Sequence, residues 1–325
     1  MSPIKRILVA VKTVDRPSAA VVKATQIARA TGASIELFHC VDAGLTLQEL
    51  ATYKNGIDEF EAAQRRVWEE GLERLATQIR SHGVHVSTSA PVDHPIHEGI
   101  VRQGRRVQAD LIVTDAHVGS NFAPSLLQEV DWELVRLCTV PVLIARNPEP
   151  YQHPLVLAAL DPCQKHSKPM ALDGKILNMA ETFTSLLQGD LHAMHAYSLP
   201  AVYVEASAAS SANVAIELQA IDAQNAQAAL DAALRASSIP PERRHVLPGS
   251  PADAIIRAAT DLKASLLVMG SVGRSGLGGL LVGNTAEKAL NRIPCDLLLL
   301  KPDGFENSIP DKRRGARVVA TGAFY

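Results

Sequence analysis

The chain has 325 residues, of which 47% are hydrophobic and 20% are charged. This length is typical of two domains, and the composition is that of globular proteins that bury a core. The formal net charge of −2 provides no strong attraction to nucleic acid or to a membrane surface. The sequence has no apolar run near the roughly 20 residues of a membrane span and no signal-peptide pattern, so we expect a cytoplasmic protein.

The cysteines are too far apart in the sequence to form a CxxC metal or redox motif. They are Cys40, Cys138, Cys163 and Cys295. We expect four reduced thiols, mostly buried as small apolar groups, and a single long-range disulfide is the alternative.

The first half of the chain alternates between strand and helix patterns. Short apolar runs rich in β-branched residues predict strands, and longer segments that start at a polar residue or stop at a glycine predict helices. In chain order the predicted elements are a strand at 7–11, a helix at 18–30, a strand at 34–41, a helix at 57–82, a strand at 84–90, a short helix from 93, a strand at 109–114 and, after a loop and a helix, a strand at 140–145.

The second half repeats this pattern. Its predicted elements are a strand at 155–160, a helix that ends near 187, a strand at 190–196, a helix at 214–237, a strand at 244–247, a helix from 250, a strand at 265–269 and a strand at 295–300. Equivalent residues recur at a nearly constant spacing, as with Pro95 and Pro251 or Pro141 and Pro294. A repeat of this length predicts a duplicated domain.

Alternating strands and helices predict an α/β fold with parallel sheets. We expect two tandem, doubly wound five-stranded sheets of order 3-2-1-4-5, in domains 1–147 and 153–302, and a disordered tail at 303–325. The fifth strand of each domain is an apolar edge that begins near a proline, so we expect the domains to pair through these edges as a pseudo-two-fold internal dimer. Whether the whole chain forms a further homodimer is left open.

Ligands of such sheets bind at the carboxyl ends of the strands, where the strand order reverses. In the second half a glycine-rich segment follows the fourth strand and leads into a helix that starts near Asn284. Glycines expose backbone N–H groups and a helix N-terminus carries partial positive charge, so the segment suits a phosphate, with Asn284 or Thr285 adding a side-chain contact. The alternative is an ordinary helix start.

Gly270, Gly273 and Gly283 are separated by two and nine residues, and this spacing resembles the ATP-binding loop of the universal stress protein family. The Ala-Glu-Lys and Pro-Cys sequences ahead of the final strand are similar as well, and the duplicated layout resembles the tandem E-type class. The resemblance implies a cytoplasmic protein that supports survival under stress, including DNA damage. It also implies a nucleotide held by the loops after the first and fourth strands.

The resemblance assigns further roles to individual residues. Asp161, just after the first strand of the second half, would meet the adenine side of the ligand, and a turn or cap residue is the alternative. Arg274 would reach a phosphate, and a solvated loop arginine is the alternative. The sequence departs from the family pattern at Asn284, which stands before the hydroxyl residue Thr285.

The first half has lost this pattern. Lys12 stands at the position of Asp161, Asp115 stands at that of Gly270, and Val118 replaces Gly273. We therefore expect this half to act as a scaffold or to carry a different ligand.

Two further features allow alternatives. His94 with His97, and His192 with His195, form HxxH pairs without a recognisable set of further metal ligands, so we expect no metal site. The 197–213 segment is rich in Ala and Ser and is either a crossover or a lid beside the second site.

These observations predict a non-catalytic protein that binds a nucleotide or another small ligand, with ATP in the second domain only. The sequence contains no P-loop Gly-Lys-Ser/Thr motif. A slow ATP hydrolase and a carrier of an apolar or nucleotide-linked metabolite are the alternatives.

Overall fold

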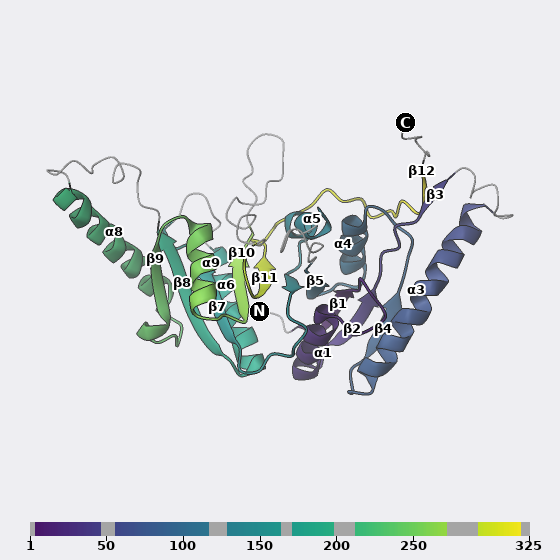
Figure 1. Ribbon diagram of the computed structural model, residues 1–325, viewed down its shortest axis with the longest axis horizontal. Helices are drawn as coiled ribbons and strands as arrows, with labels where there is room; N and C mark the ends of the chain where they lie inside the picture. The colour runs from purple at the N-terminus through teal and green to yellow at the C-terminus, as the bar shows by residue number, and fades with distance from the viewer. Residues whose placement is uncertain are drawn as a thin grey trace. The chain divides into compact units, whose positions relative to one another are not determined.

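The computed structural model describes residues 4–46, 56–116, 129–163, 171–197, 212–271 and 292–319. These residues form two compact α/β units (Figure 1). The first unit contains the described residues up to 150 together with 306–319, and the second contains those between 151 and 305. Within the described part of the chain, no helix is both long and apolar enough to cross a membrane.

The first unit is a parallel sheet with the strand order β4-β2-β1-β5-β6. Its elements are β1 (Arg6–Ala10), α1 (Ala19–Thr31), β2 (Ser34–Phe38), β3 (Gly44–Thr46), α3 (Ile57–Arg80), β4 (Val86–Ser89), α4 (Ile96–Arg106), β5 (Leu111–Asp115), α5 (Glu129–Leu137), β6 (Val142–Ala145) and β12 (Arg317–Val319).

The second unit repeats the arrangement with the strand order β11-β10-β7-β8-β9. Its elements are β7 (Leu155–Leu160), α6 (Ala171–Leu187), β8 (Asp190–Tyr197), α8 (Ala212–Ala233), a short 3-10 helix (Pro241–Arg243), β9 (Arg244–Pro248), α9 (Pro251–Asp261), β10 (Leu266–Gly270) and β11 (Asp296–Leu300).

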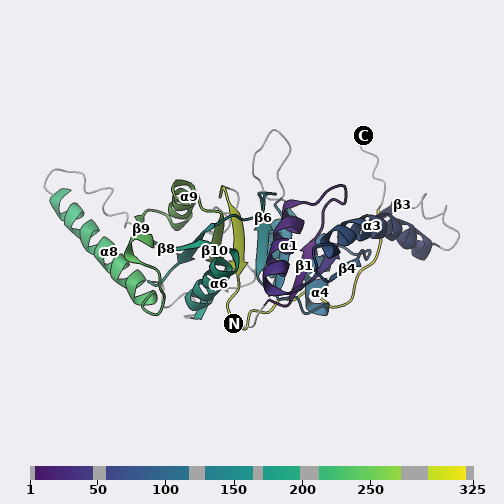
Figure 2. The same ribbon diagram turned by 90° about the horizontal axis from the view of Figure 1, so that it is seen from below.

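Each unit thus has the order 3-2-1-4-5, which confirms the predicted doubly wound sheets. Helices cover both faces of each sheet, because right-handed connections on opposite sides of the first strand lie on opposite faces. Figure 2 shows α6 and α9 on opposite sides of the second sheet, and α1 and α4 on opposite sides of the first. The strands are apolar on both sides for this reason, and all five residues of β11 are buried.

Local capping explains where several helices begin and end. The Ser18 hydroxyl oxygen accepts a hydrogen bond from the N–H of Val21, and α1 ends at Gly32 in the left-handed conformation with a φ of 73°. The Ser250 hydroxyl oxygen accepts from the N–H of Asp253, and Pro251 occupies the first turn of α9. The start of α4 differs from the predicted start at 93, because Pro95 precedes the helix and Ile96 is its first residue.

The tail differs from the predicted disorder over residues 306–319, which lie against the first unit. Its last described residues form β12, which pairs in parallel with β3, with Arg317 opposite Gly44. The low apolar content of the segment does not prevent this, because its contacts are mainly hydrogen bonds and ion pairs.

The cysteine prediction is confirmed in its main points. No disulfide joins any two of the four cysteines, all of which lie within the described residues, and Cys40, Cys138 and Cys295 are buried while Cys163 is exposed. Burial raises the pKa of the Cys40 thiol to about 12, so this cysteine is not a reactive thiolate.

Candidate functional site

The strand order of the second unit reverses between β7 and β10. These strands are neighbours, with Met269 of β10 opposite Ala159 of β7. The chain continues from β7 to β8 on one side and from β10 to β11 on the other. The carboxyl ends of β7 and β10 therefore flank the crevice at which doubly wound sheets bind ligands.

Asp161 lies at this edge, directly after β7. Its backbone N–H donates to Oδ1 of Asp173, in the first turn of α6, at 3.2 Å. Its side chain is 36% exposed, so a carboxylate is presented at the end of the first strand of this unit. Its place directly after the first strand agrees with the sequence analysis, and its role toward a ligand stays a prediction.

His195 lies beside Asp161, and the sequence analysis named it only as part of an HxxH pair and not as a residue of this edge. The Nδ1 of the ring donates to the carbonyl of Leu160 at 3.2 Å and lies 3.9 Å from Oδ1 of Asp161. The side chain is only 2% exposed, and its Nε2 has no hydrogen-bond partner among the described residues. When the ring is neutral, the proton on Nδ1 leaves Nε2 as an acceptor at the carboxyl end of β8.

Gly270, the last residue of β10, lies close to the side chains of α6. A Cβ at this position would lie 2.7 Å from Cδ2 of Leu172 and 3.3 Å from Cδ1 of Ile176, both in α6. The sequence suggested that this glycine admits a ligand to the backbone. The structure adds a second feature, which is the close contact between the start of α6 and the end of β10.

Ser271 and Lys301 extend the same edge. The Ser271 N–H donates to the carbonyl of Leu300 at 2.8 Å, and Nζ of Lys301 donates to the Ser271 hydroxyl at 3.2 Å. Nζ of Lys301 also lies 4.6 Å from the centre of the Phe305 ring. A buried ammonium group thus contacts the first residue of the glycine-rich segment. A lysine directly after the final strand was the sequence signal that could have identified it.

The remaining predicted ligand residues, which belong to the glycine-rich segment, lie outside the described residues. They are Gly273, Arg274, Gly283, Asn284 and Thr285. The same holds for Val118 and for residues 198–211 of the insert.

The equivalent edge of the first unit is occupied by its own side chains. Nζ of Lys12 donates to the carbonyl of Asp115 and lies 3.3 Å from Oδ1 of Asp131, whose side chain is fully buried. Oδ1 of Asp115 accepts from the N–H of Ala20 at 2.8 Å. Burial lowers the pKa of Lys12, and the neighbouring Asp131 counteracts this shift. An internal ion pair thus stands where the second unit has Asp161 and Gly270.

Further packing covers the loop that follows β1. A Cβ on Gly71 of α3 would lie 2.5 Å from Cγ2 of Val14, so this loop rests directly on α3. Nδ1 of His39 donates to the carbonyl of Val11 at 2.7 Å, and the ring stacks on Trp68 with a centroid distance of 3.3 Å. Burial lowers the pKa of His39, which favours its neutral form.

The structure does not bring either HxxH pair together as a metal site. Nδ1 of His94 donates to the carbonyl of Gly315 at 2.8 Å, and His192 forms a 2.9 Å hydrogen bond with His245 of β9. Within the described residues, no group of three or more His, Cys, Asp and Glu side chains is placed to hold a metal ion.

These two sheets, each with its crevice between the first and fourth strands, agree with the comparisons with known proteins. A family model described as "Universal stress protein family" matches residues 3–146 and 171–301. The chain belongs to the universal stress protein family. This confirms the resemblance that the glycine spacing and the duplicated layout indicated.

Several curated members of the family are similar to most of the chain. Universal stress protein E of Salmonella typhi is 27% identical over 259 residues, which cover 76% of this chain and 77% of that protein. Universal stress protein E of Escherichia coli K12 is 25% identical over 256 residues, with a coverage of 76% and 77%.

Solved structures agree on the fold. A putative universal stress protein from Pseudomonas aeruginosa UCBPP-PA14 has a TM-score of 0.71 and 26% identity, and the match covers 92% of this chain and 94% of that chain. A functionally unknown protein from Pseudomonas aeruginosa PAO1 has the same TM-score and 25% identity, with a coverage of 92% and 93%.

Proposed function

We propose that the second unit of this universal stress protein binds a nucleotide, with ATP as the first candidate, and that the protein acts by binding and not by catalysis. The observation that carries the proposal is the position of Asp161 and Ser271 at the ends of the two strands where the sheet order reverses. The glycine-rich segment that resembles an ATP-binding loop starts at this edge.

Three chemical features of the edge support a nucleotide. Asp161 supplies a carboxylate that accepts hydrogen bonds from an adenine amino group or a ribose hydroxyl. Lys301 supplies positive charge beside the start of the glycine-rich segment. His195 supplies a buried acceptor nitrogen without a partner among the described residues. The combination suits a ligand that is polar at one end and anionic at the other.

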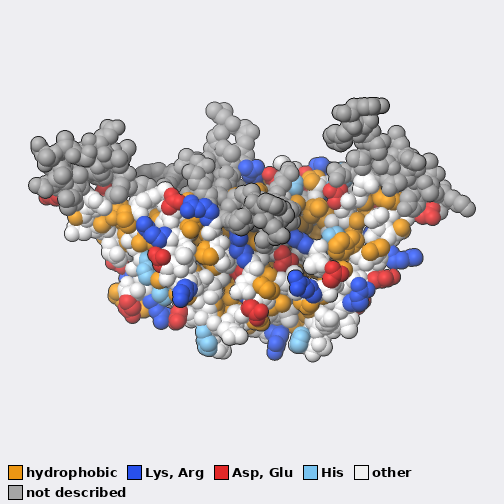
Figure 3. All heavy atoms as spheres, viewed as in Figure 1, with side chains coloured by type: hydrophobic (Ala, Val, Ile, Leu, Met, Phe, Trp, Pro, Cys, Tyr) orange, Lys and Arg blue, Asp and Glu red, His pale blue; other side chains and the backbone are white. Residues whose placement is uncertain are grey.

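The charge distribution supports a small ligand over a nucleic acid. Acidic and basic side chains of the described residues are interspersed on the face drawn in Figure 3. A nucleic-acid partner requires a basic patch or stripe, and the net charge of −2 does not favour one.

We propose that the first unit does not bind a nucleotide in this way. A phosphate or ribose would compete with the ion pair of Lys12 and Asp131 and with the Asp115 carboxylate. A purified chain should therefore bind one nucleotide. Native mass spectrometry measures this number directly, and two bound nucleotides would contradict the assignment of the first unit.

Isothermal titration calorimetry with ATP on the full chain tests the second unit. We expect Gly283→Asp to abolish measurable binding, because it places a carboxylate among the phosphate-binding groups. Ala236→Asp, at an exposed position near the end of α8, adds the same charge elsewhere and should bind like the wild type. Equal affinity of Gly283→Asp and Ala236→Asp would refute the site.

A second variant pair tests Asp161. Asp161→Asn removes the charge with almost no change of shape and should weaken ATP binding by about tenfold, the effect of one lost charged hydrogen bond. Asp261→Asn, at the exposed end of α9, is the matched control. Asp161 has no part in binding if both variants retain the wild-type affinity.

A measurement of phosphate release from ATP distinguishes the proposed binding protein from the alternative, a slow ATP hydrolase. We expect no turnover above that of a mock preparation. Release that disappears specifically in Asp161→Asn or Gly273→Ala would overturn the non-catalytic proposal. The cytoplasmic location and the support of survival under stress, including DNA damage, are proposed from the family resemblance alone.

A further inference from the structure

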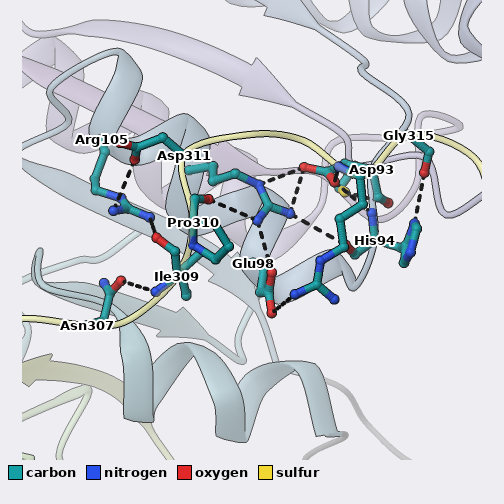
Figure 4. Close-up of polar contacts among 12 residues, drawn as sticks. Asp93, His94, Glu98, Arg105, Asn307, Ile309, Pro310, Asp311 and Gly315 are labelled. Carbon is teal, nitrogen blue, oxygen red and sulfur yellow. Dashed lines mark hydrogen bonds and ion pairs between the residues drawn. The ribbon is translucent and has the colours of Figure 1, made fainter.

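Residues 306–319, here called the C-terminal strap, follow the second unit in sequence but lie along the first. The strap is the yellow segment that runs to β12 in Figure 1, and its polar contacts are drawn in Figure 4. It crosses α4, the loop that precedes α4, the first turns of α3, and β3. None of these contacts involves the candidate nucleotide site.

The strap first contacts α5 and α4. Nδ2 of Asn307 donates to the carbonyl of Leu137 at 2.7 Å. Among the strap residues 306–316, only Ile309 is buried, and 7% of its surface is exposed. Arg105 of α4 donates through Nη2 to the carbonyl of Ile309 at 2.7 Å, and its Nη1 lies 3.2 Å from Oδ1 of Asp311. An apolar anchor and an ion pair thus define the start of the contact.

The middle of the strap covers a buried ion pair of the first unit. Nη2 of Arg102 lies 2.8 Å from Oδ2 of Asp93, and the two side chains are 5% and 1% exposed. Nη1 of Arg102 also donates to the carbonyl of Pro310 at 3.3 Å. Arg314 completes the cluster, since its backbone N–H donates to Oδ1 of Asp93 at 2.9 Å and its Nη2 donates to Oε1 of Glu98 at 3.0 Å.

At the end of the strap, side chains of the first unit form hydrogen bonds with backbone groups of the strap. His94 donates to the carbonyl of Gly315, and Oε1 of Glu61 accepts from the N–H of Ala316 at 2.7 Å. Strand β12 then pairs with β3 as an added parallel strand. Main-chain pairing together with a side-chain anchor is the way in which proteins bind extended peptides.

The surface is stabilised by contacts within the first unit, whereas the strap depends on its contacts with that surface. Arg102 contacts both Asp93 and Glu98 without the strap, and its Nη1 donates to Oε2 of Glu98 at 2.9 Å. In the strap, residues 310–314 are all exposed. A segment that is held by one buried side chain and otherwise by polar contacts opens at a much lower free energy than the core of its domain.

We propose that this face of the first unit is a peptide-docking surface, and that the C-terminal strap is its detachable occupant, released without unfolding of the unit. The surface fits an extended segment with an aliphatic anchor, an acidic residue two positions later and an arginine three positions after that. Ile309, Asp311 and Arg314 supply this pattern.

Peptide competition on the full chain tests the docking surface. The probe is a fluorescent peptide with the sequence of residues 306–319. Ile309→Asp in the protein weakens its own strap and leaves the surface intact, so the probe should bind this variant at least tenfold more tightly than it binds the wild type. Lys312→Ala, at an exposed strap position, is the matched control and should behave like the wild type.

A second probe peptide carries the Ile309→Asp substitution itself. It should not bind the Ile309→Asp protein, because binding requires an aliphatic side chain at the anchor position. Fluorescence anisotropy measures the affinities, and circular dichroism verifies that each variant is folded. A folded Ile309→Asp protein that binds neither peptide, or both equally, would overturn the proposal.

Hydrogen exchange of the wild-type chain tests the release. The N–H groups of Arg314 and Ala316 bond to Asp93 and Glu61, so their exchange reports on opening of the strap. We expect them to exchange at least a hundredfold faster than the core strands β1 and β5. Exchange at the same rate as those strands would mean that the strap leaves only on unfolding, and the proposal would be wrong.

Discussion

Single residues at equivalent positions give the two halves opposite properties. The first strand is followed by an ammonium group in one unit, at Lys12, and by a carboxylate in the other, at Asp161. The fourth strand ends in Asp115 in one unit and in Gly270 in the other. Oδ1 of the Asp115 carboxylate accepts a hydrogen bond from the N–H of Ala20 at the start of α1, whereas Gly270 leaves room for the side chains of α6. Because of these differences, the protein's own side chains occupy the carboxyl-end edge of the sheet in the first unit.

The ion pair of the first unit should contribute to stability. Lys12→Met removes the cation beside the fully buried Asp131 carboxylate, and breaking a buried pair in this way costs up to about 3 kcal/mol. The cost is reduced because the Lys12 side chain retains 27% exposure. Urea unfolding measures the effect, and the double variant Lys12→Met/Asp131→Leu should recover part of it. No loss in the single variant would contradict the role of this pair.

Gly270 offers a matched pair of glycine variants. Gly270→Val should destabilise the protein by about 1–3 kcal/mol, because the added atoms meet Leu172 and Ile176. A Cβ on Gly174, in α6, meets nothing within 4 Å, so Gly174→Ala should be neutral or slightly stabilising. Unfolding midpoints in urea measure both, and equal midpoints would show that packing does not require this glycine.

At the scale of elements, a histidine pair links β8 to the edge strand β9. Nδ1 of His192 and Nε2 of His245 are 2.9 Å apart, the planes of the two rings differ by 5°, and their centres are 5.2 Å apart. Two ring nitrogens at this distance share one hydrogen atom in a hydrogen bond. The pair is therefore a cross-strand hydrogen bond.

This pair should make stability depend on pH. Burial lowers the pKa of both His192 and His245 below the ordinary value of 6.5. The unfolded chain then binds more protons than the folded chain between the lowered values and 6.5, so stability falls as the pH drops through this window. Melting temperatures between pH 7.5 and 5 measure the effect. His192→Gln should flatten this part of the curve, and an unchanged slope would exclude the pair as its source.

At the scale of the whole molecule, the chain leaves the first unit at residue 150 and returns to it at 306. The second unit is thus inserted between two parts of the first, and the domain division at 302 from the sequence did not include this return. Tyr151, which falls between the predicted domains 1–147 and 153–302, lies in the second unit, where its hydroxyl donates to the buried Asp296 at 2.7 Å.

The pairing of the two units as an internal dimer stays a prediction. Coupled units unfold together, so scanning calorimetry of the full chain should give a single transition. Leu298→Lys, which places an ammonium group in the fully buried β11, should lower the temperature of that transition for the whole chain. Two separate transitions in the wild type would refute the coupling.

The sequence by itself determined the repeated α/β pattern, the order of the strands, the capped starts of α1 and α9, and the place of Asp161 directly after the first strand of the second unit. These features depend on local periodicity, on capping chemistry and on the handedness of connections, all of which act over short stretches of chain. The glycine spacing likewise indicated the family.

Only the tertiary structure decided which distant groups meet. Lys12 and Asp131, His192 and His245, and Arg314 and Asp93 are pairs of residues far apart in the chain, and no local pattern marks either partner. Their side chains are brought together by the packing of helices and strands, and the strap in particular has too little apolar content to be recognised as structured. Its order comes from polar groups that α4 and the preceding loop place in one row.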